Sequence, residues 1–473
     1  MRARAGRGVW SALRRAGWAL AAPALRWRHR GAPVVHHRPL PEATPRALEG
    51  YVTPVWAPAG AERAVHLRSP HPATELLVER YAGYDAGAPD GQRFEPVARR
   101  PAGRHQPETQ ADERAGCGWP VSLRLDTRGW RQGTYRATLR APEADAETVR
   151  QSAITFLIGP AAPGARVAVL APVTTWAAYN PWGGRSLYHN EIDGTVPVWA
   201  SLARPNPALD WSPVGAMHAM AAEAPVHAWL DAQVGADLYP DWMLEQPDRL
   251  AGYDLVVLAY HCEYASDAMR DGLDRLLAGG ASLLALGGNQ LYWRVRWDAA
   301  HTCVECRKDA SRFADGARGG LWRRRGRPED DVLGVRFAPP GTGTYAPYRV
   351  EDAGHWLFDG LDLADGDLFG HHGTTPLPLC GDETDAPTWF TRASAQVIAR
   401  GLNRPDAIDG PYTLWHPRDP AWDGSAGGTI AWTPRSPTQA VLATGAIHSA
   451  SGLGADPVFT HVVRRFLDRY LDA

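Results

Sequence analysis

The segment that decides the fold is DLVVLAYHCEYASDAMRDGLDRLLAGGASLLALGG, residues 254–288. It contains two runs, 254–259 and 281–286, that are apolar apart from Asp254 and Ser282, and such runs are typical of strands buried on both faces. Between them, Ser266 can cap a helix whose apolar residues repeat at helical spacing, and glycines 279–280 can end it. A strand, a helix and a strand in this order predict two parallel strands joined by a right-handed crossover.

The pattern of apolar strands and amphipathic helices continues on both sides of this segment. Residues 167–170 form another apolar run, 440–443 read as a strand, and 458–470 have the spacing of an amphipathic helix. Strands that alternate with helical patterns favour an α/β sheet covered by helices. We therefore expect residues 165–473 to form an α/β domain with a doubly wound, mainly parallel sheet.

Residues 46–160 have a different pattern, in which short strands are separated by Gly, Pro and Asp turns. Several short strands with turn signals predict an all-β, immunoglobulin-like sandwich. The polar stretch 97–116 is expected to be a loop, and residues 160–164 a short linker between the two domains. The strands are expected at 64–67, 75–81, 121–125, 134–139 and 153–158.

The first 45 residues contain eight arginines up to Arg30 and no acid before Glu42. We expect residues 1–45 to be a basic, flexible leader, and the short apolar stretch 17–25 leaves an N-terminal export signal as an alternative. The chain contains no run of eighteen apolar residues, so the sequence predicts no membrane span. The expected location is the cytoplasm.

The composition excludes some classes of function. The 473 residues include 50 basic and 52 acidic ones, and this balance argues against a nucleic-acid partner, which favours a basic surface. Five cysteines do not make a disulfide framework. Cys303 and Cys306 have the spacing of a zinc pair, but no second pair follows. All but one of the basic residues are arginines, which makes the single lysine, Lys308, a candidate for a role that needs an amine.

Polar and aromatic residues are dense after three of the expected strands, at 174–188, at 260–264 and at 287–296. In open parallel sheets, ligands bind beyond the carboxyl ends of the strands. The second and third of these segments belong to one strand–helix–strand unit. His261, Glu263 and Asn289 are therefore expected on the same edge of the sheet.

These segments resemble the large (β) subunit of N,N-dimethylformamidase, in the C-terminal domain shared by its wider family. The similar motifs are AYNPWGGRSLY at 178–188, HCEY at 261–264 and GGNQLYWRVR at 287–296. GDETD at 381–385 is similar too. The resemblance covers about 165–460, and the sandwich before it resembles the family's N-terminal β-domain. The fold it implies agrees with the α/β domain expected from the strand pattern.

The resemblance implies a mononuclear iron site, with Fe³⁺ held by Tyr179, Tyr188 and Glu263. Phenolate and carboxylate are hard oxygen ligands that suit ferric iron. A metal ion in such a site can polarise an amide carbonyl and acidify water. No organic cofactor is expected.

The resemblance also implies three catalytic residues. His261 would act as a general acid or base, and Asn289 would donate to the developing oxyanion. Lys308 would either do the same or orient the substrate. Two features depart from the family pattern: HCEYA stands where HDEYW is more common, and the stretch 428–433 has no acid although the family has a glutamate near a late strand.

The sequence therefore predicts a metal-dependent hydrolase that cleaves the C–N bond of a small amide, as a homo-oligomer or with a small partner subunit. Two alternatives stay open. The chain could be a non-catalytic relative that uses the edge of the α/β sheet to bind a ligand or partner. It could also be a hydrolase of the glutamine-amidotransferase-like type, with Cys262 as nucleophile, although bulky neighbours would crowd such a turn.

Overall fold

The structure is a computed structural model of the chain. It describes residues 46–88, 91–108, 112–188, 197–211, 218–338, 342–388, 391, 394–403 and 427–471. The predictions for the leader, residues 1–45, lie outside the described residues.

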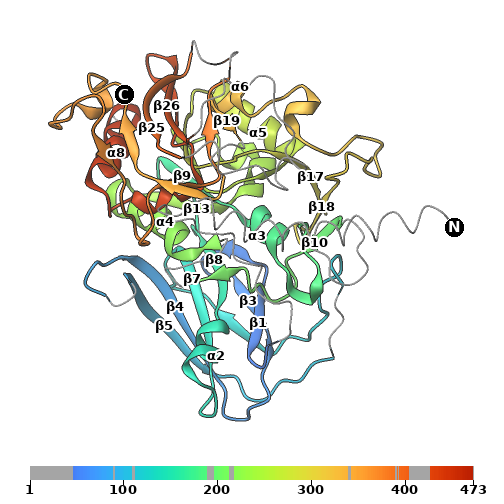
Figure 1. The fold of residues 1–473 in the computed structure, drawn as a ribbon. Helices are drawn as coiled ribbons and strands as arrows, with labels where there is room; N and C mark the ends of the chain where they lie inside the picture. The colour runs from blue at the N-terminus through green and yellow to red at the C-terminus, as the bar shows by residue number, and fades with distance from the viewer. Residues whose placement is uncertain are drawn as a thin grey trace, which may run out of the picture.

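Two small sheets between Glu49 and Gly159 form the first part of the molecule, which occupies the lower half of Figure 1. One sheet has the strand order β1-β3-β6 and the other has the order β2-β8-β7-β4-β5. The strands are β1 (Glu49–Thr53), β2 (Trp56–Pro58), β3 (Glu62–Arg68), β4 (Glu75–Tyr84), β5 (Gln92–Pro101), β6 (Leu123–Asp126), β7 (Gly133–Arg140) and β8 (Ile154–Gly159).

Alternating side chains of these strands meet in a common apolar core. Val65 and Leu67 from the smaller sheet pack in the same cluster as Leu76 and Phe156 from the larger one. This arrangement supports the predicted sandwich, and all five expected strands are present. The prediction of a loop over 97–116 was wrong in its first part, because residues up to Pro101 continue strand β5.

The second part is built on a nine-stranded sheet, in the upper half of Figure 1, with the order β13-β9-β14-β16-β27-β26-β25-β21-β22. Its strands are β9 (Val167–Ala171), β13 (Ala236–Pro240), β14 (Leu255–Tyr260), β16 (Ser282–Gly287), β21 (Tyr348–Val350), β22 (Leu368–Phe369), β25 (Gln396–Gly401), β26 (Thr429–Ser436) and β27 (Gln439–Ala443).

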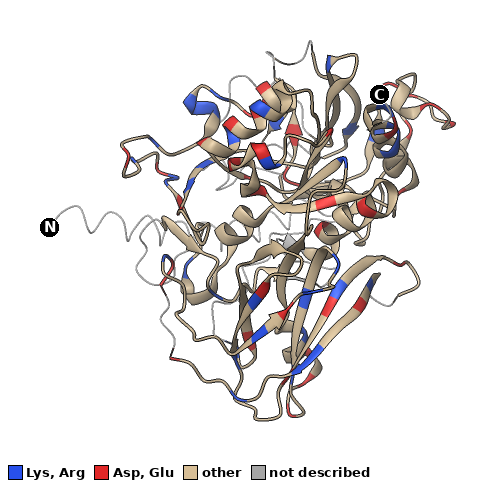
Figure 2. Ribbon diagram, turned by 180° about the vertical axis from the view of Figure 1, so that it is seen from behind, with Lys and Arg blue, Asp and Glu red and all other residues tan. Residues whose placement is uncertain are grey.

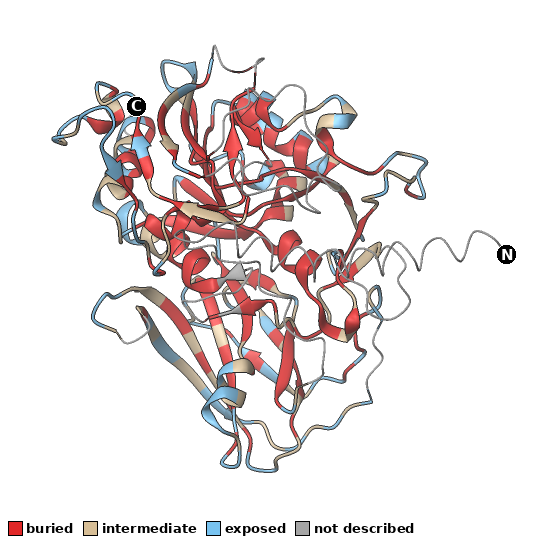
Figure 3. Ribbon diagram, in the orientation of Figure 1, coloured by how far each residue is buried: buried red, intermediate tan, exposed pale blue. Residues whose placement is uncertain are grey.

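The segment quoted at the start folds as predicted. β14 and β16 pair in parallel, and helix α5 (Asp267–Ala278) connects them, with the Ser266 side chain accepting a hydrogen bond from Met269 N at its N-terminus and Gly279 at its C-terminus. Every residue of β14 and β16 is buried, which agrees with their almost entirely apolar sequences. In Figure 3 the middle of the large sheet, in the upper half of the view, is coloured mostly as buried.

The predicted fold class is confirmed in part. Strands β13, β9, β14, β16 and β27 are mutually parallel, but β26, β25, β21 and β22 extend the sheet in antiparallel order. The sheet is therefore mixed, and the structure does not confirm a doubly wound arrangement. The described helices are α2 (Ala146–Gln151), α3 (Val173–Tyr179), α4 (Met220–Val234), α5, α6 (Asp330–Leu333) and α8 (Pro457–Leu471).

Four smaller sheets complete the described part of the chain. One has the order β10-β18-β17-β15, with β10 (Trp199–Ser201), β15 (Tyr264–Ser266), β17 (Trp293–Trp297) and β18 (Cys303–Cys306). The others are the pairs β11 (Leu209–Asp210) with β12 (His218–Ala219), β19 (Arg336–Phe337) with β24 (Asp385–Ala386), and β20 (Thr344–Ala346) with β23 (Cys380–Asp382).

The sandwich covers one edge of the large sheet. Edge strand β13 exposes backbone groups that need partners, and the sandwich supplies them: Trp56 Nε1 donates to Leu238 O at 3.0 Å, and Leu238 N donates to Gln132 Oε1 at 3.1 Å. Trp56, Tyr81 and Leu157 also belong to the core of the large sheet. The two parts are therefore joined by side chains as well as by the linker.

Positive and negative residues are interspersed over the ribbon in Figure 2 rather than gathered by sign. Among the helices that the structure describes, none combines the length and the apolar character that a membrane span requires.

Candidate functional site

The candidate site lies where β9, β14 and β16 end, at the same edge of the sheet. The backbone there is locally strained, since Tyr260, Asn289 and Leu291 have positive φ values of 61°, 47° and 57°. Gly287 is required at the end of β16, because a Cβ atom would lie 1.5 Å from Tyr260 O. Strain of this kind clusters at functional sites, where the surrounding structure enforces it.

Three oxygen-bearing side chains meet at this edge. Tyr188 Oη donates to Glu263 Oε1 at 2.5 Å, and Tyr179 Oη donates to Tyr188 Oη at 3.1 Å. Tyr179 is the last residue of α3, which follows β9, and Glu263 follows β14. The structure therefore brings together the three residues that were expected to hold a metal. The strand ends that precede them lie at the same edge of the sheet.

His261 lies beside this cluster and is 2% exposed. Its Nε2 is 3.3 Å from Glu263 Oε2 and 3.4 Å from Tyr179 Oη. Its Nδ1 donates to Gly288 O at 2.9 Å, which directs Nε2 towards the cluster. The structure thus places His261 on the same edge as Glu263, as the sequence predicted.

Glu383 is a site residue to which the sequence analysis gave no role. Its Oε2 is 3.8 Å from His261 Nε2 and accepts a hydrogen bond from Asn289 Nδ2 at 2.7 Å. Its backbone is tied to the exit of β27, since Ile447 N donates to Glu383 O at 3.1 Å. An acid is therefore present at the site although residues 428–433 have none. The only signal for it in the sequence was the motif GDETD at 381–385.

Asn289 holds this part of the site together. Its side chain donates to Glu383, and its backbone N donates to Asp385 Oδ1 at 2.8 Å. Its Oδ1 is buried without a hydrogen-bond partner in the described part of the chain. Asn289 thus orients the Glu383 carboxylate, while its predicted role as an oxyanion donor stays a prediction.

Lys308 reaches the cluster from the segment after β18. Its Nζ lies over the ring of Tyr188, 3.1 Å from the centroid, and is 4.9 Å from the Trp293 ring and 5.3 Å from the Tyr264 ring. This amine has no hydrogen-bond partner among the described residues. Burying an amine without a hydrogen-bond partner costs free energy of folding. Such a cost is typical of a group that binds a ligand.

Burial and neighbouring charges shift the pKa values at the site. Burial works against a charged His261, but its hydrogen bond to Glu263 and the charge of that residue raise its pKa to about 9. Burial raises the pKa of Glu383 to about 8 and lowers the pKa of Lys308 to about 8. Shifts of this size gather where acids and bases are adapted to catalysis.

The residues present fit a hard metal cation. Metal–oxygen bonds of about 2 Å place adjacent ligand oxygens roughly 3 Å apart, and the oxygens of Tyr188, Tyr179 and Glu263 are separated by 2.5 and 3.1 Å along the cluster. Tyr179 is 3% exposed, whereas Tyr188 is 41% exposed and only its hydroxyl end is enclosed. Burial of the hydroxyl groups and then Glu263 raise the pKa of both phenols well above the usual value, so ionising them calls for an added positive charge. Among the described residues, no group of three or more His, Cys, Asp or Glu side chains forms an alternative metal site.

The structure argues against Cys262 as a nucleophile. Its Sγ points into the core, 3.8 Å from Leu170 O and 3.7 Å from Ala259 O, and the residue is 1% exposed. Burial raises the pKa of this thiol well above its usual value. Buried thiols of this kind are unreactive. Cys303 and Cys306 are also buried and unbridged.

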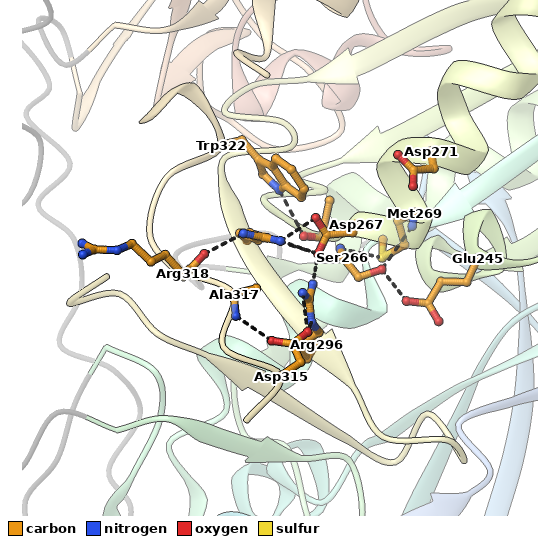
Figure 4. A network of polar contacts seen from close by, with 12 residues as sticks. Glu245, Ser266, Asp267, Met269, Asp271, Arg296, Asp315, Ala317, Arg318 and Trp322 are labelled. Carbon is orange, nitrogen blue, oxygen red and sulfur yellow. Dashed lines mark hydrogen bonds and ion pairs between the residues drawn. The ribbon is translucent and has the colours of Figure 1, made fainter. Parts of the chain in front are cut away.

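The segment that follows Glu263 is anchored by the polar network in Figure 4. Asp267, the first residue of α5, pairs with Arg294 at 2.8 Å, and Arg296 reaches both Asp267 and Asp315. Trp322 Nε1 donates to Ala265 O at 3.1 Å. These contacts fix the junction of β15 and α5, and therefore the end of the turn that carries His261 and Glu263.

Two features define the class of protein. The chain combines a β-sandwich with a mixed sheet, and an oxygen-rich cluster lies at the carboxyl edge of that sheet. Residues 78–461 match the family described as N,N-dimethylformamidase beta subunit-like, C-terminal, and the chain belongs to this family. The match begins within β4, so it includes part of the sandwich as well as the residues 165–460 that the resemblance covers.

The chain is also similar to the N,N-dimethylformamidase beta subunit of Paracoccus aminophilus, with 25% identity over 217 residues. The aligned part is 40% of this chain and 28% of that relative. The chain thus matches less than a third of the relative's length.

Proposed function

We propose that this chain is an iron-dependent hydrolase that cleaves the C–N bond of a small amide. The observation that carries the proposal is the convergence of the Tyr179, Tyr188 and Glu263 oxygens with His261 beside them, Nε2 lying 3.3 Å from Glu263. Membership of the formamidase-like family and the name of the Paracoccus relative support an amide as substrate.

Tyr179, Tyr188 and Glu263 would hold the iron. When bound, it would supply a Lewis acid that polarises the amide carbonyl and lowers the pKa of water. The tyrosines would lose their protons on loading, because only the phenolate is a strong ligand. The remaining polar groups of the site would then handle the substrate and the protons.

Glu383 and His261 would move the proton. Hydrolysis adds water across the C–N bond, so a C–O bond forms, the C–N bond breaks, and a proton passes from water to the leaving nitrogen. Glu383, which accepts a hydrogen bond from Asn289 at 2.7 Å, would accept that proton. His261, whose Nε2 is 3.8 Å from Glu383 Oε2, would pass it on to the leaving nitrogen. Lys308 would donate to the substrate oxygen.

The test is hydrolysis of a panel of formamide, N-methylformamide and N,N-dimethylformamide by the iron-loaded chain, measured as released amine. Glu383→Gln should lower kcat by about 100-fold, which is the usual contribution of a general base, and should leave the iron content unchanged. Glu223→Gln is the control, because Glu223 is also buried but has no role in the proposed proton transfer; its Oε2 accepts from Trp176 Nε1 at 2.8 Å.

Full turnover of Glu383→Gln would remove this residue from the mechanism. Iron-loaded chain that hydrolyses none of these amides would favour the alternative of a non-catalytic binding protein. We further propose that the chain assembles with copies of itself or with a small partner subunit, as the word subunit in the relative's name suggests. Analytical ultracentrifugation of the purified chain tests the first of these assemblies.

A further inference from the structure

The turn that carries His261 and Glu263 is held by two side chains that have no assigned role. Thr175, in α3, is fully buried, and its Oγ1 donates to His261 O at 2.6 Å and accepts from Glu263 N at 3.1 Å. One hydroxyl thereby pairs with two backbone groups of the turn.

The side chain of Gln290 pairs with two further backbone groups of the same turn. Its Oε1 accepts from Cys262 N at 2.7 Å, and its Nε2 donates to Tyr260 O at 3.1 Å. It is 1% exposed and directly follows Asn289. The backbone groups Tyr260 O, His261 O, Cys262 N and Glu263 N are thus all bonded to the side chains of Thr175 and Gln290.

The two residues also connect separate parts of the site. Thr175 lies one helical turn before Tyr179 in α3, so it ties the helix that carries one proposed iron ligand to the turn that carries another. Gln290 ties the exit of β16 to the same turn. A site works only when its groups are held to within about half an ångström, and the left-handed φ of Tyr260 would not persist without such support.

We propose that Thr175 and Gln290 are positioning residues that set the distances among His261, Glu263 and Tyr179. This inference rests on the iron-dependent function proposed above. Outer contacts that orient metal ligands typically contribute about 10-fold to 100-fold in metal affinity. Neither residue is placed to touch the iron or the substrate.

The first experiment does not need iron. Hydrogen–deuterium exchange of the full chain is compared for the wild type and Thr175→Val, Thr175→Ser and Thr127→Val. Thr127 is a matched control in the sandwich, since it is fully buried and its Oγ1 donates to Ala61 O at 2.7 Å and accepts from Gly60 N at 3.0 Å. Thr175→Val should speed exchange in the peptide covering 260–263 at least about 10-fold. Thr175→Ser and Thr127→Val should not.

The second experiment measures ferric iron affinity and the visible spectrum of the same variants, with Gln290→Met added. Thr175→Val and Gln290→Met should weaken iron binding about 10-fold to 100-fold, and Thr175→Ser should restore it. If Thr175→Val resembles Thr127→Val in both experiments, the positioning role is overturned. If the wild type takes up no iron, the proposed function fails, and the exchange rates of residues 260–263 alone decide for or against the positioning role.

Discussion

At the scale of a single residue, Lys308 is expected to lower the stability of the fold, and the proposed function gives its amine a role in binding the substrate. Its amine is enclosed by the rings of Tyr188, Trp293 and Tyr264 and has no hydrogen-bond partner in the described part of the chain. Lys308→Met should therefore keep or raise the melting temperature, because it removes an unpaired buried amine. It should lower kcat/KM at least about 10-fold if the amine binds the substrate oxygen.

Lys308→Arg should impair turnover as well, because the planar guanidinium does not fit a space shaped around a small ammonium group. Calorimetry and amide hydrolysis measured on the same preparations check both variants. Unchanged turnover in Lys308→Met would remove this lysine from the site.

The sequence was informative about residues that follow parallel strands. His261, Glu263 and Asn289 were predicted to share an edge because they follow the strands of one strand–helix–strand unit, and the structure brings them together. Glu383 could not be placed in this way. It comes from a short irregular segment between β23 and β24, and no periodicity in the sequence relates that segment to β14.

At the scale of an element, α3 depends on Asp241. This helix has no side-chain cap of its own, and Thr174 N instead donates to Asp241 Oδ1 at 3.1 Å. Burial raises the pKa of Asp241 from 3.8 to about 7. The folded state therefore binds this proton more tightly than the unfolded state, and the stability it contributes is present below pH 4 and lost as the pH rises towards 7.

Asp241→Asn should keep the acceptor oxygen but remove this titration. Relative to the variant, the wild type should lose free energy of unfolding between about pH 4 and pH 7, as measured by urea denaturation at each pH. A constant difference between the two proteins over this range would show that Asp241 is already ionised in the folded state.

The strands and helices with a strong sequence pattern were predicted, whereas those that form mainly through tertiary contacts were not. β14, α5 and β16 follow from apolar runs, a serine cap and glycines. β5 was not among the expected strands, and its end fell within the predicted loop, because it is a polar edge strand with a mostly exposed pattern. The antiparallel strands β21, β22 and β25 are held by their neighbours in the sheet rather than by local sequence.

At the scale of the whole molecule, the sandwich and the large sheet should unfold together. Trp56 donates to the edge strand β13 and packs in the core of the large sheet. Trp56→Phe would leave Leu238 O without its partner and should cost about 1–3 kcal/mol. Differential scanning calorimetry should show a single unfolding transition in the wild type. In Trp56→Phe this single transition should shift to a lower temperature without splitting. Two separate transitions in the wild type would contradict this coupling.

The central claim is that two phenolates and a carboxylate bind iron at the carboxyl edge of the sheet. Metal analysis of the purified chain, together with its visible spectrum, tests it most directly. We expect about one iron per chain and a tyrosinate-to-iron charge-transfer band, which should be lost in Tyr179→Phe, Tyr188→Phe and Glu263→Gln. A colourless chain that stays free of iron after reconstitution with ferric iron would contradict the account.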